Sequence, residues 1–155
     1  MDESAPPSPA IRSGALAALG EWLVGLDENP VVAAVVEDVE SEADRWFVRV
    51  NGDAKDVYSV WFEVKQRTLA YETYVLPAPE ENEAAFYYQL LVRNDGFRDL
   101  AFTIGEEQAV FLKGRIALEH VDDAALDRIL GSVYAAVELC FQPALRIGFA
   151  SRFEK

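Results

Sequence analysis

The chain has 155 residues, which is enough for one domain with a buried core of its own. Its formal net charge of −13 disfavours partners bound mainly through phosphate charge, so we expect no nucleic acid and no membrane among its partners. No apolar run approaches the roughly 18–20 residues that a membrane-spanning helix needs. The acidic, Pro-rich beginning lacks the basic region of a signal peptide, and a lone Cys140 can form neither an internal disulfide nor a metal cage. We therefore expect a cytoplasmic protein without redox chemistry.

Residues 1–8 offer almost nothing apolar to bury, which predicts a disordered N-terminal arm ahead of a single domain at 9–155. Ser8 and Pro9 also predict the start of a helix, because Ser is a favoured N-cap and Pro a favoured first helical residue. Apolar residues then recur at helical spacing as far as Leu26, and Asn29-Pro30 ends this helix.

Residues 31–36 are ambiguous, because the spacing of their valines fits a helix whereas their β-branched content and the preceding Pro30 favour a strand. We predict a strand. Three more strands follow at 45–50, 57–65 and 68–76. They are separated by a strong turn signal at 51–53 and a tight hairpin at 66–67.

The second half of the chain predicts a helix at 80–93, a hairpin at 99–118 and a long helix at 123–141. Glu80, Glu81 and Glu83 would stabilise the positive end of the first of these helices, and Pro143 would terminate the second. The helix at 80–93 has one apolar stripe, made of Phe86, Tyr87, Leu90 and Leu91. The predicted fold class is α+β: a mostly antiparallel sheet of five or six strands packed with helices, in the order α-β-β-β-β-α-β-β-α.

No residue pattern indicates catalysis, and we assign no catalytic, cofactor-binding or metal-binding residue. The chain has no phosphate-binding loop and no dinucleotide fingerprint. His120 is the only histidine, and its place at the end of a strand favours an exposed or capping side chain over a general base. Cys140 falls on the apolar stripe of the last helix, where a thiol behaves as a small, inert hydrophobe.

Strand alternation places a mixture of aromatic and basic side chains on the face opposite the predicted core. An exposed apolar patch of this kind usually marks a partner surface. Two alternatives stay open: the aromatic rings pack on one another and on arginine stems, or they lie under the first helix. The candidate protein-binding surface consists of Phe47, Trp61, Tyr74, Phe111, Arg49 and Arg115.

The order of elements and several short strings resemble the YbjN family of bacterial proteins over residues 15–152. The strings are RWFVR (45–49), VWFEV (60–64), TLAYETY (68–74), PEEN (79–82), LLVRN (90–94), GRIAL (114–118) and LDRILG (126–131). The resemblance implies a fold similar to type III secretion chaperones and a role as a sensory transduction regulator without an established catalytic residue. Secretion chaperones form dimers, so the resemblance also implies a homodimer.

We therefore expect a non-enzymatic protein-binding module, chaperone-like or regulatory, that acts through a sheet surface, with a protein partner that the sequence does not name. The alternative is an enzyme whose carboxylate-based or metal-dependent site is assembled from distant Asp and Glu residues. A pocket with converging carboxylates would favour the enzyme, whereas a broad apolar surface would favour the binding module.

Overall fold

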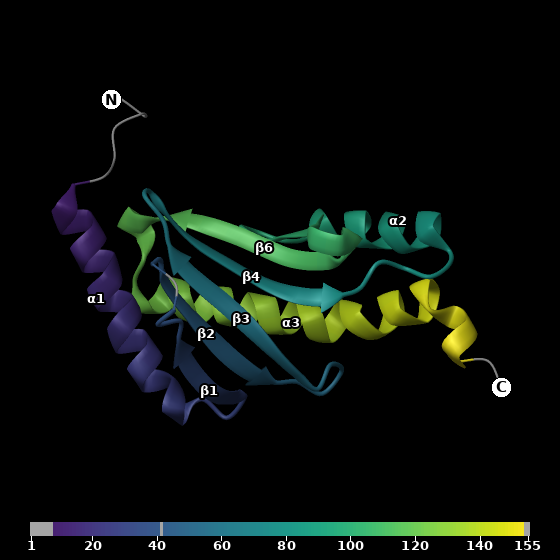
Figure 1. Cartoon of the computed structure of the whole chain (residues 1–155), viewed down its shortest axis with the longest axis horizontal. Helices are drawn as coiled ribbons and strands as arrows, with labels where there is room; N and C mark the ends of the chain where they lie inside the picture. Colours follow the sequence, from purple (N-terminus) through teal and green to yellow (C-terminus); the bar gives the residue numbers. More distant parts are fainter. Residues whose placement is uncertain (1–7, 41, 154–155) are drawn as a thin grey trace.

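The computed structural model describes residues 8–40 and 42–153, so the predicted arm lies outside the described residues except for Ser8 (Figure 1). Ser8 is the N-cap of α1, and its side chain accepts a hydrogen bond from the Ile11 amide. The helices are α1 (Pro9–Gly25), α2 (Glu83–Asn94) and α3 (Asp123–Gly148). The strands are β1 (Val32–Glu37), β2 (Asp44–Asn51), β3 (Val57–Val64), β4 (Thr68–Leu76), β5 (Ala101–Ile104) and β6 (Val110–Ala117).

The six strands form one sheet in the order β1-β2-β3-β4-β6-β5, and every neighbouring pair is antiparallel. The predicted α+β fold class and element order are confirmed. The strand prediction for residues 31–36 is also confirmed, because β1 pairs with β2 along its length. The two hairpins between β2 and β4 place three strands side by side, so side chains far apart in the chain share one surface.

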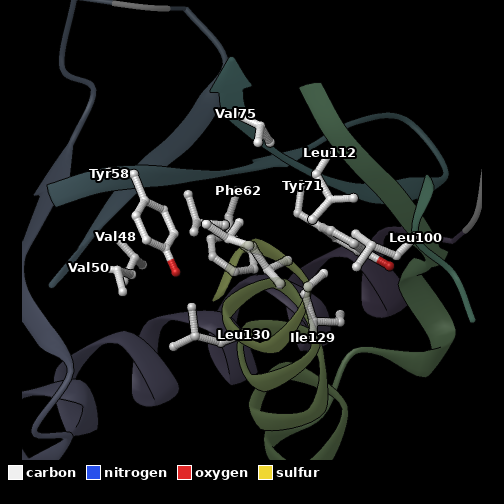
Figure 2. Packing of buried hydrophobic residues seen from close by; sticks show 14 of the residues in the cluster. Val48, Val50, Tyr58, Phe62, Tyr71, Val75, Leu100, Leu112, Ile129 and Leu130 are labelled. Atoms are coloured by element: carbon white, nitrogen blue, oxygen red, sulfur yellow. The ribbon is translucent and has the colours of Figure 1, made fainter. Parts of the chain in front are cut away.

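Helices α1 and α3 cover one face of the sheet, which is the core face (Figures 1 and 2). The alternation expected from the sequence is confirmed there, since Val48, Val60 and Phe62 are completely buried. Trp22 of α1 packs edge-on against Phe62, with ring centroids 5.4 Å apart, and its indole N–H donates to Asp127 of α3 at 2.8 Å. The strands β3, β4 and β6 and the second half of β2 therefore bury alternate side chains against the helices, and the side chains between them point to the other face.

Helix α2 begins at Glu83, three residues later than predicted, and the expected role of Glu80 and Glu81 at its positive end is wrong. Both residues bind the end of α3 instead: their backbone amides donate to the Gly148 carbonyl at 2.9 and 3.1 Å. The Glu80 carboxylate pairs with Arg152, which lowers its pKa through the hydrogen bond. The apolar stripe of α2 is also narrower than predicted, because Leu91 is 67% exposed.

Pro143 does not terminate α3, which continues for five residues beyond it to Gly148. A proline inside a helix removes one hydrogen bond and costs about 3 kcal/mol. The last turn of α3 is held by packing that the sequence pattern does not display: Ala144 is completely buried, and Gly148 lies against the Phe86 ring of α2. Tertiary contacts therefore outweigh the local preference to stop.

Candidate functional site

The surface opposite α1 and α3, called here the outer face, carries the outward side chains of β2, β3, β4 and β6. All six residues of the predicted surface lie on these strands: Phe47, Arg49, Trp61, Tyr74, Phe111 and Arg115. Within the described part of the chain, α1 and α3 cover the core face, and α2 lies beside β5 at the edge of the sheet (Figure 1). The alternative that the aromatic rings lie under the first helix is therefore wrong.

The aromatic rings of the outer face are arranged as two edge-on pairs. Phe47 and Trp61 face each other across β2 and β3, with ring centroids 5.0 Å apart and planes at 83°. Tyr74 and Phe111 do the same across β4 and β6, at 5.7 Å and 84°. The Arg45 guanidinium also lies over the Trp61 ring at 5.1 Å. The alternative of mutual packing is thus confirmed in part.

Mutual packing still leaves the rings accessible, because Trp61 is 37% exposed and Tyr74 44% exposed. The two pairs fix the ring orientations in the isolated protomer, since edge-on contacts are favourable by about 0.5–1.5 kcal/mol each. A partner that covers such rings therefore meets side chains that have little further conformational freedom to lose.

Charges on the outer face are mostly positive, although the chain as a whole is acidic. Glu63 accepts from the Arg45 Nε at 2.8 Å and lies 3.6 Å from the Lys65 Nζ. Glu72 lies 3.5 Å from the Lys113 Nζ. Arg49 and Arg115 are exposed and have no ion pair among residues 8–40 and 42–153. The carboxylates of this face are therefore already neutralised, whereas two guanidinium groups are available to a partner.

Lys55 is also part of this surface, although no pattern in the amino-acid sequence indicates it. Its ammonium donates to the carbonyls of Tyr74 and Val75 at 2.7 and 3.0 Å, and it lies 5.0 Å from the centre of the Tyr74 ring. Burial lowers the pKa of Lys55 to about 8. The surrounding loop is held by α3, where the Glu138 carboxylate accepts from the Ala54 amide at 2.7 Å. The position of Lys55 depends on that tertiary contact.

Two hollows meet on the outer face. One, of about 620 Å³, is lined by residues that include Arg45, Lys113 and Arg115. The other, of about 480 Å³, is lined by residues that include Arg49 and Tyr74. Trp61 and Glu72 line both hollows, so together they form a continuous depression across the middle of the sheet.

His120 and Cys140, the two residues that the sequence analysis considered as a general base and a reactive thiol, lie away from this surface. His120 is exposed in a short turn after β6, as predicted. Cys140 is buried on α3, as predicted, and burial raises the pKa of its thiol. In the described ranges, His, Cys, Asp and Glu side chains form no group of three or more that could hold a metal ion.

Comparison with known proteins gives relatives without an assigned activity. No family model matches the chain. The chain is 31% identical over 111 residues to an uncharacterized protein of Mycobacterium leprae, which covers 72% of this chain and 60% of that relative. It is 31% identical over 108 residues to uncharacterized proteins of Mycobacterium bovis and Mycobacterium tuberculosis, covering 70% of this chain and 59% of each relative. The chain thus matches about three fifths of the length of these bacterial relatives.

Among the described helices, none combines the length and the apolar character that crossing a bilayer requires.

Proposed function

We propose that this chain is a non-enzymatic protein-binding module of the bacterial cytoplasm, chaperone-like or regulatory, and that its partner binds the outer face. The observation that carries the proposal is the exposure of Trp61 and Tyr74 on rigid strands, beside the unpaired Arg49 and Arg115. Binding energy at protein interfaces concentrates in Trp, Tyr and Arg side chains. An accessible surface built from these three residue types on a sheet fits a docking site better than a structural surface.

Membership of the YbjN family is part of the same proposal. Six of the seven strings that resemble the family fall on β2, β3, β4, α2, β6 and α3 in the expected order, and PEEN (79–82) lies in the connection between β4 and α2. An antiparallel sheet with helices packed on it is also the arrangement that the resemblance implies. These agreements support a regulatory or chaperone-like role, by analogy of fold alone.

We also propose a homodimer, and a second apolar surface supports it. This surface, the α2–β5 patch, consists of Tyr88, Leu91, Val92 and Ile104, which are 53–71% exposed. It adjoins a hollow of about 270 Å³ lined by apolar residues such as Tyr87 and Phe102. Residues 84–92 carry no charged side chain. Two copies with a net charge of −13 repel each other least where they meet through an uncharged surface.

The alternative of an enzyme with a carboxylate or metal-dependent site has less support. The outward strand positions hold two carboxylates, Glu63 on β3 and Glu72 on the neighbouring β4. Each is held by basic side chains, namely Arg45 and Lys65 for Glu63 and Lys113 for Glu72. Because the oxygens of both carboxylates already have cationic partners, this arrangement favours binding over a carboxylate-based active site.

Affinity capture from native lysate with a matched set of variants tests the binding proposal. The wild-type chain, Trp61→Ala and the control Leu139→Ala would be immobilised in equal folded amounts. Leu139 is 54% exposed on α3, away from the outer face. We expect at least one protein retained by the wild type and by the control but lost with Trp61→Ala. An identical set of proteins on all three would contradict the proposal.

Sedimentation velocity tests the homodimer. Leu91→Asp places a charge in the α2–β5 patch and should shift the chain toward the monomer. Leu139→Asp places the same charge on an exposed position of α3 and should leave the dimer intact. A wild-type chain that sediments as a monomer at high micromolar concentration would contradict this part of the proposal.

A further inference from the structure

We infer that the outer face binds an extended segment of a partner protein that carries two carboxylates about six residues apart, with an apolar side chain between them, two residues from one carboxylate. This inference rests on the proposed function and specifies the chemistry of the partner. It is carried by the charges of the outer face, by the strand register that spaces them, and by the position of Trp61.

The outer face differs in charge from the chain as a whole. The outward positions hold five of the fourteen basic residues and two carboxylates, Glu63 and Glu72, in a chain of net charge −13. Because both carboxylates already have basic neighbours, the groups left to a partner are the guanidinium groups of Arg49 and Arg115. Complementary charge selects partners and orients them. The complement of two unpaired arginines is a pair of carboxylates.

The strand register fixes the spacing of these two arginines. Arg115 on β6 lies opposite Ala70, which lies opposite Glu63, which lies opposite Arg45 on β2. Arg49 is four residues further along β2. Arg49 and Arg115 are therefore three strand spacings apart across the sheet, about 14 Å, and four residues apart along the strands, about 13 Å. The diagonal between their Cα atoms is then about 19 Å. An extended chain covers that distance in about six residues, at roughly 3.3 Å per residue.

Trp61 occupies the middle of this diagonal. It lies opposite Phe47 and Glu72, in the row between those of Arg45 and Arg49. It lines both hollows, of which one reaches Arg115 and the other Arg49. A segment that joins the two arginines therefore crosses the exposed Trp61 ring between its two carboxylates. Side chains of an extended chain alternate in direction, so the side chain that faces the ring together with both carboxylates lies two residues from one of them and four from the other. An apolar side chain is favoured at that position.

A second copy of this chain fits this face poorly as the occupant. A two-fold contact places the same patch of both copies face to face. Here that contact would bring the unpaired arginines of one copy against the same cationic surface of the other. Repulsion of this kind discriminates against a partner, so the structure assigns the face to a different protein with an acidic segment.

A spacing series of synthetic peptides tests the inference. The central probe is acetyl-Asp-Ala-Leu-Thr-Thr-Ala-Asp-amide, with five residues between the carboxylates and the leucine on the same side of the extended chain as both of them. Two companions have three and seven intervening residues, with leucine kept two residues after the first aspartate. Binding is followed by NMR titration of the labelled chain. We expect the central probe to bind tightest, because only its length matches the diagonal.

Charge variants provide the second arm of the test. Arg49→Glu and Arg115→Glu should each weaken binding of the central probe up to about fivefold, the range of an exposed ion pair. Arg146→Glu makes the same charge change at an exposed position on α3 and should leave the affinity close to that of the wild type. A probe with one Asp replaced by Lys should regain affinity for Arg49→Glu or for Arg115→Glu, depending on which end is replaced.

Three outcomes would overturn the inference. The first is the absence of saturable binding by every probe. The second is an affinity that does not depend on spacing or that falls equally with Arg146→Glu. The third is self-association of the chain that is lost with Arg49→Glu, which would identify a second copy as the occupant. A lysate partner that still depends on Trp61 would in each case leave the proposed binding function standing, so the two failures are distinguishable.

Discussion

Trp61 and Phe62 are consecutive residues of β3 that point to opposite faces of the sheet: Phe62 is completely buried, whereas Trp61 is 37% exposed. Both make edge-on aromatic contacts, Phe62 with Trp22 of α1 and Trp61 with Phe47 of β2. One step along the strand thus separates a ring that stabilises the fold from a ring that is available to a partner.

This pair gives a matched test of stability against association. Phe62→Ala should lower the free energy of unfolding by about 3–5 kcal/mol, as expected for a large buried ring. Trp61→Ala should cost much less, about the 0.5–1.5 kcal/mol of its edge-on contact with Phe47, but should weaken association with the partner by more than about 1 kcal/mol. Thermal melting measures the first effect and partner capture per folded molecule the second. If Trp61→Ala collapses the melting temperature and leaves association unchanged, the outer face is structural.

Two glycines of α3 should respond to alanine in opposite directions. A Cβ at Gly148 would come within 2.7 Å of the Phe86 ring, so Gly148→Ala should be destabilising. Gly131 is exposed, and a Cβ there meets nothing within 4 Å. Gly131→Ala should therefore stabilise the helix by about 0.5–1 kcal/mol. Urea denaturation compares both variants with the wild type. An unchanged midpoint for Gly148→Ala would show that the end of α3 is not packed on α2.

Cys140 should be protected in the folded protein. It is 1% exposed, and burial raises the pKa of its thiol, so little thiolate is available at neutral pH. A thiol-specific chromogenic reagent should label it only at the rate of unfolding, and urea should accelerate the labelling. Cys140→Ser should lower stability, because it places a hydroxyl in an apolar environment. Rapid labelling of the native chain would contradict the burial and would reopen the redox interpretation.

Lys55 should make stability depend on pH in the alkaline range. Burial lowers its pKa from 10.5 to about 8, so between these values the unfolded chain binds more protons than the folded one. The contribution of Lys55 to stability therefore rises with pH from about 8 to about 10.5. The unfolding free energy of the wild type minus that of Lys55→Met should therefore increase across this pH window.

Ionisation of tyrosine also makes stability depend on pH in this range, and the comparison of wild type with Lys55→Met controls for it. Burial raises the pKa of Tyr71 to about 12, which lowers stability above pH 10, because the unfolded chain then loses protons first. That effect is common to the wild type and Lys55→Met and cancels in their difference. A difference that stays flat from pH 8 to 10.5 would show that hydrogen bonds to the Tyr74 and Val75 carbonyls keep the ammonium charged despite burial.

The sequence by itself determined the features that depend on short-range periodicity. A strand alternates its side chains with a period of two, so the inward Val60 and Phe62 and the outward Trp61 follow from pattern alone. The same holds for the apolar face of α3. The residues that recur there at helical spacing are buried, namely Leu126, Ile129, Leu130, Val133, Val137 and Cys140. The fold class followed from the order of these periodic segments.

Only the tertiary structure decided the features that depend on contacts between distant segments. The extension of α3 past Pro143 and the late start of α2 arise where Gly148 meets Phe86 and the amides of Glu80 and Glu81. The place of Lys55 depends on Glu138 of α3, which holds its loop. That Arg49 and Arg115 have no ion pair within residues 8–40 and 42–153 depends on which strands lie next to each other in the sheet. Periodicity reports which side of an element is buried, whereas the identity of the neighbour is set by how the elements pack together.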